Sequence, residues 1–168
     1  MDLFIAFLAF VVLIALEFLL SQYWMGAYFR FGIPLYHRRG RIYSSANAET
    51  LSQALIHQFS GRTEHPSIRF KALAPGQVAF RETLFENRGG FRYLPVMHSL
   101  LRLHPEQGGY SLTGYLNWYV LYILVYLILH SIEDRTFVPI AVLVLFLLAL
   151  SYAAQFGIHQ QVAEKIEE

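Results

Sequence analysis

The sequence of 168 residues contains no cysteine. This absence excludes disulfides, thiolate metal sites and cysteine nucleophiles, but it does not identify the redox compartment. Charged residues are also scarce, at 15% of the chain against about 25% in an ordinary soluble domain. The formal net charge of +1 gives no indication of nucleic-acid binding.

Apolar residues, in contrast, are abundant. Hydrophobic residues make up 55% of the chain and aromatic residues 16%, and the mean hydropathy is +0.39. A soluble protein this short cannot bury so much apolar surface, so we expect a bilayer to be its solvent.

Three apolar runs cover residues 3–20, 116–132 and 137–156. The first has about the length that a bilayer core requires. A cleaved signal peptide is the competing interpretation, but it needs a basic start, a shorter core and a small-residue cleavage site. No Lys or Arg precedes this run, and the sequence after it is a poor cleavage site. We therefore expect an uncleaved membrane helix within residues 1–24.

The second and third runs are separated only by the short polar segment 130–136. Such a link predicts an antiparallel helical hairpin over residues 116–168, with a short cytoplasmic tail. Thr136 is suited to cap the third helix, and Pro139 lies in its first turn, where a missing N–H costs little. Trp and Tyr favour the headgroup level of a membrane. The expected interface anchors are therefore Tyr23, Trp24, Trp118 and Tyr119.

Basic residues near the helix ends predict the orientation. They flank the central block at Arg30, Arg38, Arg39, Arg41 and Arg102. The hairpin link holds only Arg135, beside two acidic residues. The positive-inside rule then places the central block and the C-terminus in the cytoplasm, and the N-terminus and hairpin tip outside. We expect a multi-pass protein of the cell membrane, specifically a bacterial inner membrane.

The central block, residues 25–115, predicts a juxtamembrane segment followed by a small α+β domain. Residues 23–36 are aromatic and indicate an interfacial segment along the inner leaflet, and residues 45–59 have the spacing of an amphipathic helix. Alternating segments at 68–73 and 78–84 predict a β-hairpin, and further strands are expected at 91–103 and 110–116. The predicted fold class is an α-helical membrane protein: three transmembrane helices with an inserted domain of one helix and an antiparallel meander.

Glu17 stands near the cytoplasmic end of the first apolar run. An ionised carboxylate in hydrocarbon costs about 2.5 kcal/mol or more. One hypothesis is a proton or cation site, or an ion pair with a partner subunit; the other is a hydrogen-bonded packing contact between helices. Residues expected at a comparable depth are Tyr122, Tyr152 and Gln155.

The basic run Arg38, Arg39 and Arg41 suits anionic lipid headgroups, at about 1 kcal/mol for each charge. A specific lipid pocket and a simple topology anchor both remain open. The seven histidines lack the paired spacing of a metal site, and we expect neither a metal nor a cofactor.

Two functions are compatible with this sequence. The first is a non-enzymatic accessory or assembly subunit of a larger membrane complex, because the chain is small and shows no catalytic constellation. The second is a membrane-bound enzyme or sensor that binds anionic lipid or phosphate groups at the inner leaflet. The expected partners are other integral membrane subunits, in a hetero-complex or a homo-oligomer, and anionic lipids, but no nucleic acid.

Overall fold

The computed structural model describes residues 3–41, 49–50, 53–54, 57, 68–82, 95–104 and 108–167. Five described strands form one antiparallel sheet in the order β1-β5-β4-β3-β2. Their bounds are β1 (Pro34–Arg41), β2 (Ile68–Ala74), β3 (Gln77–Glu82), β4 (Met97–His104) and β5 (Gly109–Leu116).

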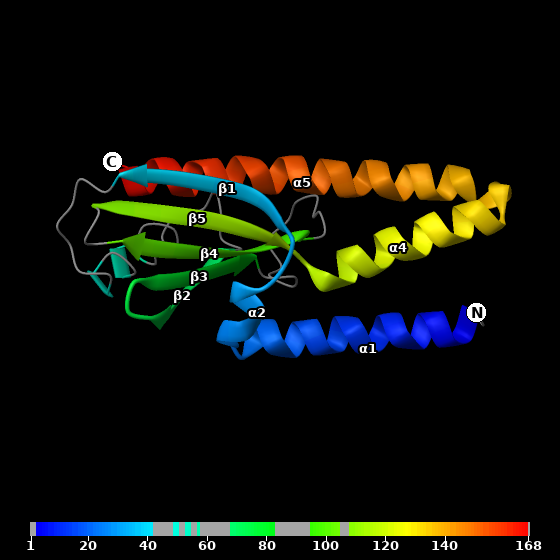
Figure 1. Ribbon diagram of the computed structural model, residues 1–168, viewed down its shortest axis with the longest axis horizontal. Coiled ribbons are helices and arrows are strands. Elements are labelled where there is room, and N and C mark those ends of the chain that lie inside the picture. The colour runs from blue at the N-terminus through cyan, green and yellow to red at the C-terminus, as the bar shows by residue number, and fades with distance from the viewer. Residues whose placement is uncertain are drawn as a thin grey trace.

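Three long helices accompany the sheet: α1 (Leu3–Gln22), α4 (Trp118–Glu133) and α5 (Val138–Glu167). The short helix α2 (Gly26–Arg30) follows α1, and the 3-10 turn η2 (Arg135–Phe137) joins α4 to α5. The strands and long helices run along one common axis, and α5 extends over the whole length of the molecule (Figure 1). At 1.5 Å per residue, its 30 residues span about 45 Å.

The two faces of the sheet meet different neighbours because strand residues alternate between them. One face packs under the C-terminal half of α5, where Leu101 and Leu112 join Val162 and Ile166 in the main core. The opposite face is covered in part by α2. There Phe29 is fully buried in a second cluster, whose other buried members are Tyr28, Ala79, Leu100 and Tyr115.

The predicted combination of helix and antiparallel sheet is confirmed, and β2 to β5 lie close to the predicted segments. The β2–β3 turn places Gly76 at φ +71°, a conformation that glycine adopts without strain. Other predicted features, the turn at 87–90 and the strand start at 91–94, lie outside the described residues. Of the predicted helix 45–59, only positions 49–50, 53–54 and 57 are described, and these are helical.

The strand β1 was not predicted. The expected interfacial segment 23–36 instead forms α2 and then enters this strand, which pairs with β5 at the edge of the sheet. The apolar alternation that signals a strand is absent because Arg38 and Gly40 occupy the face toward α5. The charge of Arg38 is tolerated on this face because it forms an ion pair with Glu167 of α5. The Nη2 atom of Arg38 lies 2.6 Å from Oε2 of Glu167. The ion pair with α5 thus stabilises β1 without the apolar alternation that usually signals a strand.

Two helical segments are long and apolar enough to cross a membrane, by length and composition: Ile5–Gln22 and Arg135–Glu167. A signal sequence and the core helix of a soluble protein can meet the same criteria. The helix α4, Trp118–Glu133, is apolar but shorter. Only 11% and 17% of the residues in the two apolar windows are buried within the protein.

Gly40 offers a test of how tightly β1 fits beneath α5. A Cβ atom at this position would lie 2.5 Å from the Tyr110 ring and 2.5 Å from Glu167 Oε1, whereas one at Gly157 would meet nothing within 4 Å. We expect Gly40→Ala to lower the free energy of unfolding by about 1–3 kcal/mol, because Tyr110 is buried and must shift. Gly157→Ala, the control within α5, should be neutral or stabilising by about 0.5–1 kcal/mol. Thermal unfolding in detergent measures both, and equal midpoints would contradict this packing.

Candidate functional site

The N-terminus of α4 is capped by a side chain from α1. The first N–H groups of any helix have no partner within that helix. Here Glu17 Oε1 accepts a hydrogen bond from the Trp118 amide at 2.9 Å, and Oε2 accepts one from the Tyr119 amide at 2.8 Å. Glu17 itself is 4% exposed, so the two helices meet in a site from which water is nearly excluded.

The short helix α2 adds a third hydrogen bond to this carboxyl group. The Tyr28 hydroxyl donates to Glu17 Oε1 at 2.7 Å. Burial, followed by the proximity of Glu17, raises the pKa of Tyr28 above its ordinary value. Tyr28 therefore keeps its proton and remains a donor at neutral pH. Its contacts connect α1, α2 and α4 through one acidic side chain.

The sheet joins this group through His98 of β4. Its Nδ1 atom lies 2.9 Å from Asn117 Oδ1, and its ring stacks on that of Tyr28 with centroids 4.0 Å apart. The Asn117 amide nitrogen in turn donates to the Pro95 carbonyl at 2.7 Å, and the Tyr119 hydroxyl also donates to that carbonyl. Because Asn117 Oδ1 is the acceptor, the hydrogen-bond network assigns the imidazole proton to Nδ1.

Two charged residues of β3 complete the surroundings. Arg81 donates from Nη2 to Gln22 Oε1 at 3.0 Å, and its guanidinium lies 5.1 Å from the ring centroid of Trp24. Burial lowers the pKa of Arg81 from its ordinary value. Glu82 accepts a hydrogen bond from Gln155 Nε2 at 3.2 Å.

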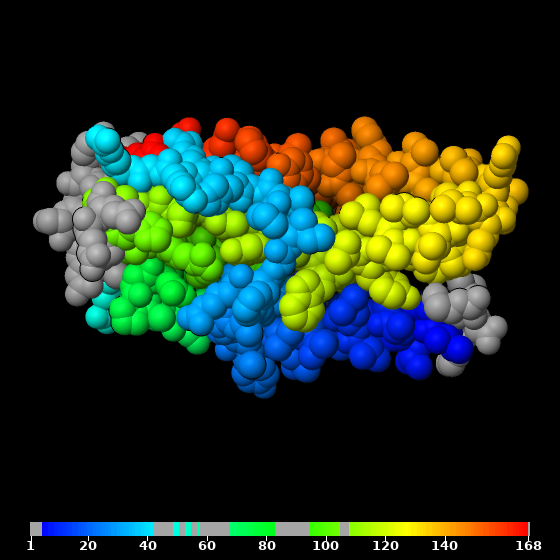
Figure 2. All heavy atoms as spheres, viewed as in Figure 1, coloured from blue at the N-terminus to red at the C-terminus, as the bar shows by residue number. Residues whose placement is uncertain are grey.

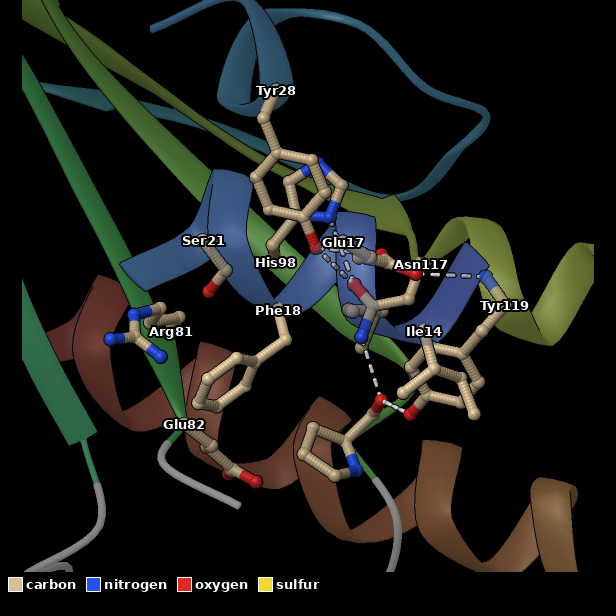
Figure 3. A pocket seen from close by; sticks show the side chains of 12 residues that line it. Ile14, Glu17, Phe18, Ser21, Tyr28, Arg81, Glu82, His98, Asn117 and Tyr119 are labelled. Atoms are coloured by element: carbon tan, nitrogen blue, oxygen red, sulfur yellow. Dashed lines mark hydrogen bonds between the residues drawn. The ribbon is translucent and has the colours of Figure 1, made fainter. Parts of the chain in front are cut away.

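A cavity of about 100 Å³ lies among these groups (Figure 3). Tyr28, His98, Glu17 and Asn117 gather on one side of it, and Arg81 and Glu82 lie on the other. Since one water occupies about 30 Å³, the cavity has room for a few waters or a small polar group. Two buried nitrogens here, Arg81 Nε and His98 Nε2, have no hydrogen-bond partner among the residues that the structure describes.

The polar helix residues expected at the depth of Glu17 bond to separate groups of the protein. Tyr122 donates to the Ala6 carbonyl of α1 at 2.7 Å, and Tyr152 donates to the Leu35 carbonyl of β1 at 3.3 Å. Gln155 Oε1 accepts from the Val96 and Met97 amides at 2.8 and 2.9 Å. Each of the three residues thus connects a different pair of segments, and none of these hydrogen bonds involves Glu17.

The predicted lipid-binding arginines are also separated by the alternation of β1. Arg38 faces α5 and binds Glu167, whereas Arg39 and Arg41 point to the other side of the sheet. Arg39 donates from Nε to His37 Nε2 at 3.1 Å.

The predicted interface anchors occupy different environments. Trp24 lies beneath Arg81, and Trp118 meets the edge of Tyr28 with ring centroids 5.6 Å apart. Tyr119 is buried in the first turn of α4, whereas Tyr23 is 75% exposed.

Sequence reasoning missed Tyr28, His98 and Asn117. Asn117 stands directly before the apolar run of α4, in the position of a helix cap, and that was a usable signal. Tyr28 and His98 carried no such signal, because their partners Glu17 and Asn117 lie in other elements and no local periodicity relates them. In the part of the chain that the structure describes, no group of three His, Asp or Glu side chains could hold a metal ion. No family model, curated protein or solved structure matches the chain.

Glu17→Leu should destabilise the protein severely. It leaves two helix amides and the Tyr28 hydroxyl without their acceptor, at about 1–3 kcal/mol each. We expect a loss of at least about 3 kcal/mol in the free energy of unfolding, while Glu17→Gln, which keeps one acceptor oxygen, loses less than half as much. Tryptophan fluorescence in detergent measures both. Glu133→Leu, at an exposed position, is the control, and equal effects of Leu and Gln at position 17 would disprove the capping role.

Acid should weaken the fold through His98. Burial lowers the pKa of His98 to about 4, and the hydrogen bond with Asn117 opposes this only in part. Between pH 6.5 and 4 the unfolded chain therefore binds more protons than the folded one. The contribution of neutral His98 to the free energy of unfolding is therefore complete above about pH 6.5. It falls by roughly 3 kcal/mol as the pH approaches 4.

We expect His98→Gln to have a lower unfolding midpoint at pH 7.5 but a smaller further drop at pH 5 than the original protein. His104→Gln, at an exposed histidine, should retain the original pH dependence. Parallel slopes for the original protein and His98→Gln would exclude His98 as the titrating group.

Proposed function

We propose that this chain is a multi-pass membrane protein in which α1, α4 and α5 cross the bilayer and the sheet domain stands on the cytoplasmic side. We propose further that it acts as a non-enzymatic accessory or assembly subunit of a larger membrane complex. The observation that carries the proposal is the apolar, outward-facing surface of all three helices.

This surface is extensive. Large apolar side chains that are more than a third exposed occur along α1 at Phe7, Val12 and Leu19, along α4 at Val125, Ile128 and Leu129, and along α5 at Val142, Phe146 and Leu150, among others. The three helices pack side by side at the end of the molecule away from most of the sheet (Figure 2). Exposed apolar area of this extent supports a lipid or protein neighbour.

The short helix α4 fits a membrane position because of its capped start. Its 16 residues reach about 24 Å, less than the roughly 30 Å of a bilayer core. Unsatisfied amides are costly near hydrocarbon. Glu17 satisfies the first two amides of α4, which supports placement of the helix end at the edge of the apolar layer.

The accessory role is supported by how the polar side chains are used. Glu17, Tyr122 and Gln155, three polar residues of the apolar helices, all bond to groups of the same chain. These bonds stabilise the arrangement of the helices and leave mainly apolar faces directed outward. Such faces suit packing against the helices of other subunits.

A membrane-bound enzyme or sensor for anionic lipid is the second candidate. It is favoured by the cavity at the junction, where the atoms Arg81 Nε and His98 Nε2 have no hydrogen-bond partner within the described part of the chain. An anionic lipid or phosphate group would accept a hydrogen bond from the arginine.

The proposed topology predicts opposite labelling at the two ends of α5. Because the chain lacks cysteine, a single introduced cysteine is a unique reporter. Glu133→Cys should react with a membrane-impermeant maleimide in intact cells, while Glu164→Cys should react only after permeabilisation. Both positions are exposed in the structure, so neither is shielded by the protein itself. The reverse pattern would invert the topology, and labelling of both in intact cells would reject it.

The subunit role predicts a stoichiometric membrane partner. We expect the tagged protein, purified from its native membrane in mild detergent, to bring down the same integral membrane protein whether the tag is at the N- or C-terminus. An untagged strain is the control for binding to the resin. A pure monomer or homo-oligomer that retains anionic lipid would instead support the enzyme or sensor.

A further inference from the structure

The positive charge of the sheet is segregated onto one face. Along β1, Arg39 and Arg41 lie on the face away from α5, opposite to Arg38. On β4 the same face carries Arg102 and His104, since Ser99 and Leu101 point toward α5.

Strand register places these residues in rows. Arg39 is opposite Ser111, which is opposite Arg102 and then Gln77. The row toward the membrane helices contains His37, Thr113, Leu100, Ala79 and Lys71. The row beyond contains Arg41, Gly109 and His104. We name this surface the basic face and define it by Arg39, Arg41, Lys71, Arg102, His37 and His104.

Acidic residues of the described strands do not compensate this charge. Their one carboxylate, Glu82, alternates to the α5 side of the sheet, where Gln155 donates to it. Arg38, the arginine of β1 on that side, is paired with Glu167. The strand residues on the side toward α5 therefore include one arginine and one carboxylate. On the basic face, in contrast, every charged residue of the described strands is a cation. Arg39, Arg41, Lys71 and His104 are exposed, and Arg102 is half-buried.

The basic face stands at a steep angle to the proposed bilayer. The strands run along the same axis as α1 and α5 (Figure 1). If these helices cross the membrane, β1 extends away from it by about 26 Å over its eight residues. The face then looks sideways, and lipid headgroups can reach only its end near the membrane. A neighbouring subunit in the same membrane can cover all of it.

Nucleic acid is a poorer match for this surface. Proteins that bind single strands present exposed aromatic rings on which bases stack. The aromatic residues on this side of the described sheet and α2 are Tyr28, Phe29 and Tyr115, and all three are buried.

We infer that the basic face is a docking surface for an acidic cytoplasmic surface of a neighbouring membrane subunit. This inference rests on the proposed subunit function and assigns the chemistry of the partner. The contacts are ion pairs to carboxylates, positioned by Arg39 and Arg102 on either side of Ser111.

A photo-crosslinking amino acid at Ser111, in the full chain and its native membrane, tests the inference. We expect it to join the chain to an acid-rich segment of an integral membrane protein, identified by mass spectrometry. Arg39→Glu/Arg102→Glu should lower this product by about tenfold or more. Arg39→Lys/Arg102→Lys keeps the charges and should retain it. Arg135→Glu, a charge reversal at the hairpin tip, and a crosslinker at Glu164 on α5 are the controls for charge and position.

The other outcomes separate the two proposals. If a partner co-purifies but its crosslink from Ser111 survives the double charge reversal, the subunit role stands and the basic face is not its docking surface. Crosslinks to lipid, to nucleic acid or to a second copy of the chain also overturn the inference. If no partner is recovered with the original protein, the subunit function fails and the inference fails with it.

Discussion

The helices α1, α2 and α4 and the sheet all meet at the start of α4. The first two amides of α4 have no partner within the helix. Glu17 accepts hydrogen bonds from both, and from the Tyr28 hydroxyl as well. An acidic group at a helix N-terminus also interacts favourably with the helix dipole. The arrangement explains why a carboxyl group is tolerated in an otherwise apolar helix: its oxygens accept three hydrogen bonds, two of them from helix amides that have no partner within α4. It also joins α1 to the first turn of α4, which follows directly after β5.

From this junction, α5 organises the rest of the molecule. Its first half packs beside α4 and its second half covers one face of the sheet, so a single helix connects the apolar end to the sheet domain. The covered face is neutralised by contacts such as Arg38 with Glu167. On the other face, α2 packs near the end where α4 begins, together with the partly buried Leu20, Trp24 and Trp118, and Arg39, Arg41 and Lys71 remain exposed. The same alternation of β1 residues therefore produces one internal ion pair and one external basic surface.

Much of the sheet could be predicted because it depends on local signals. The turn at Gly76 and the alternation along β2 and β3 identify the hairpin, and the apolar runs identify the helices. The junction was harder. Glu17 stood out as a charge in an apolar run, but its partners at the start of α4 and in α2 did not, and Tyr122, Tyr152 and Gln155, expected at a comparable depth, bond to other groups. Tyr122 lies on α4 and the other two lie on α5, and each of the three bonds to a backbone group of another element or segment.

By itself, the sequence determined the apolar character of three segments, the strand-forming pattern between them and the absence of thiol chemistry, because each depends on composition or short-range periodicity. Only the tertiary structure decided that Glu17 caps α4, that His98 and Asn117 join it, and that β1 is a strand at all. These features depend on partners up to 129 residues away. Hydrogen bonds and ion pairs of that kind follow from the packing of α1, α4 and α5 against the sheet, and no local pattern encodes them.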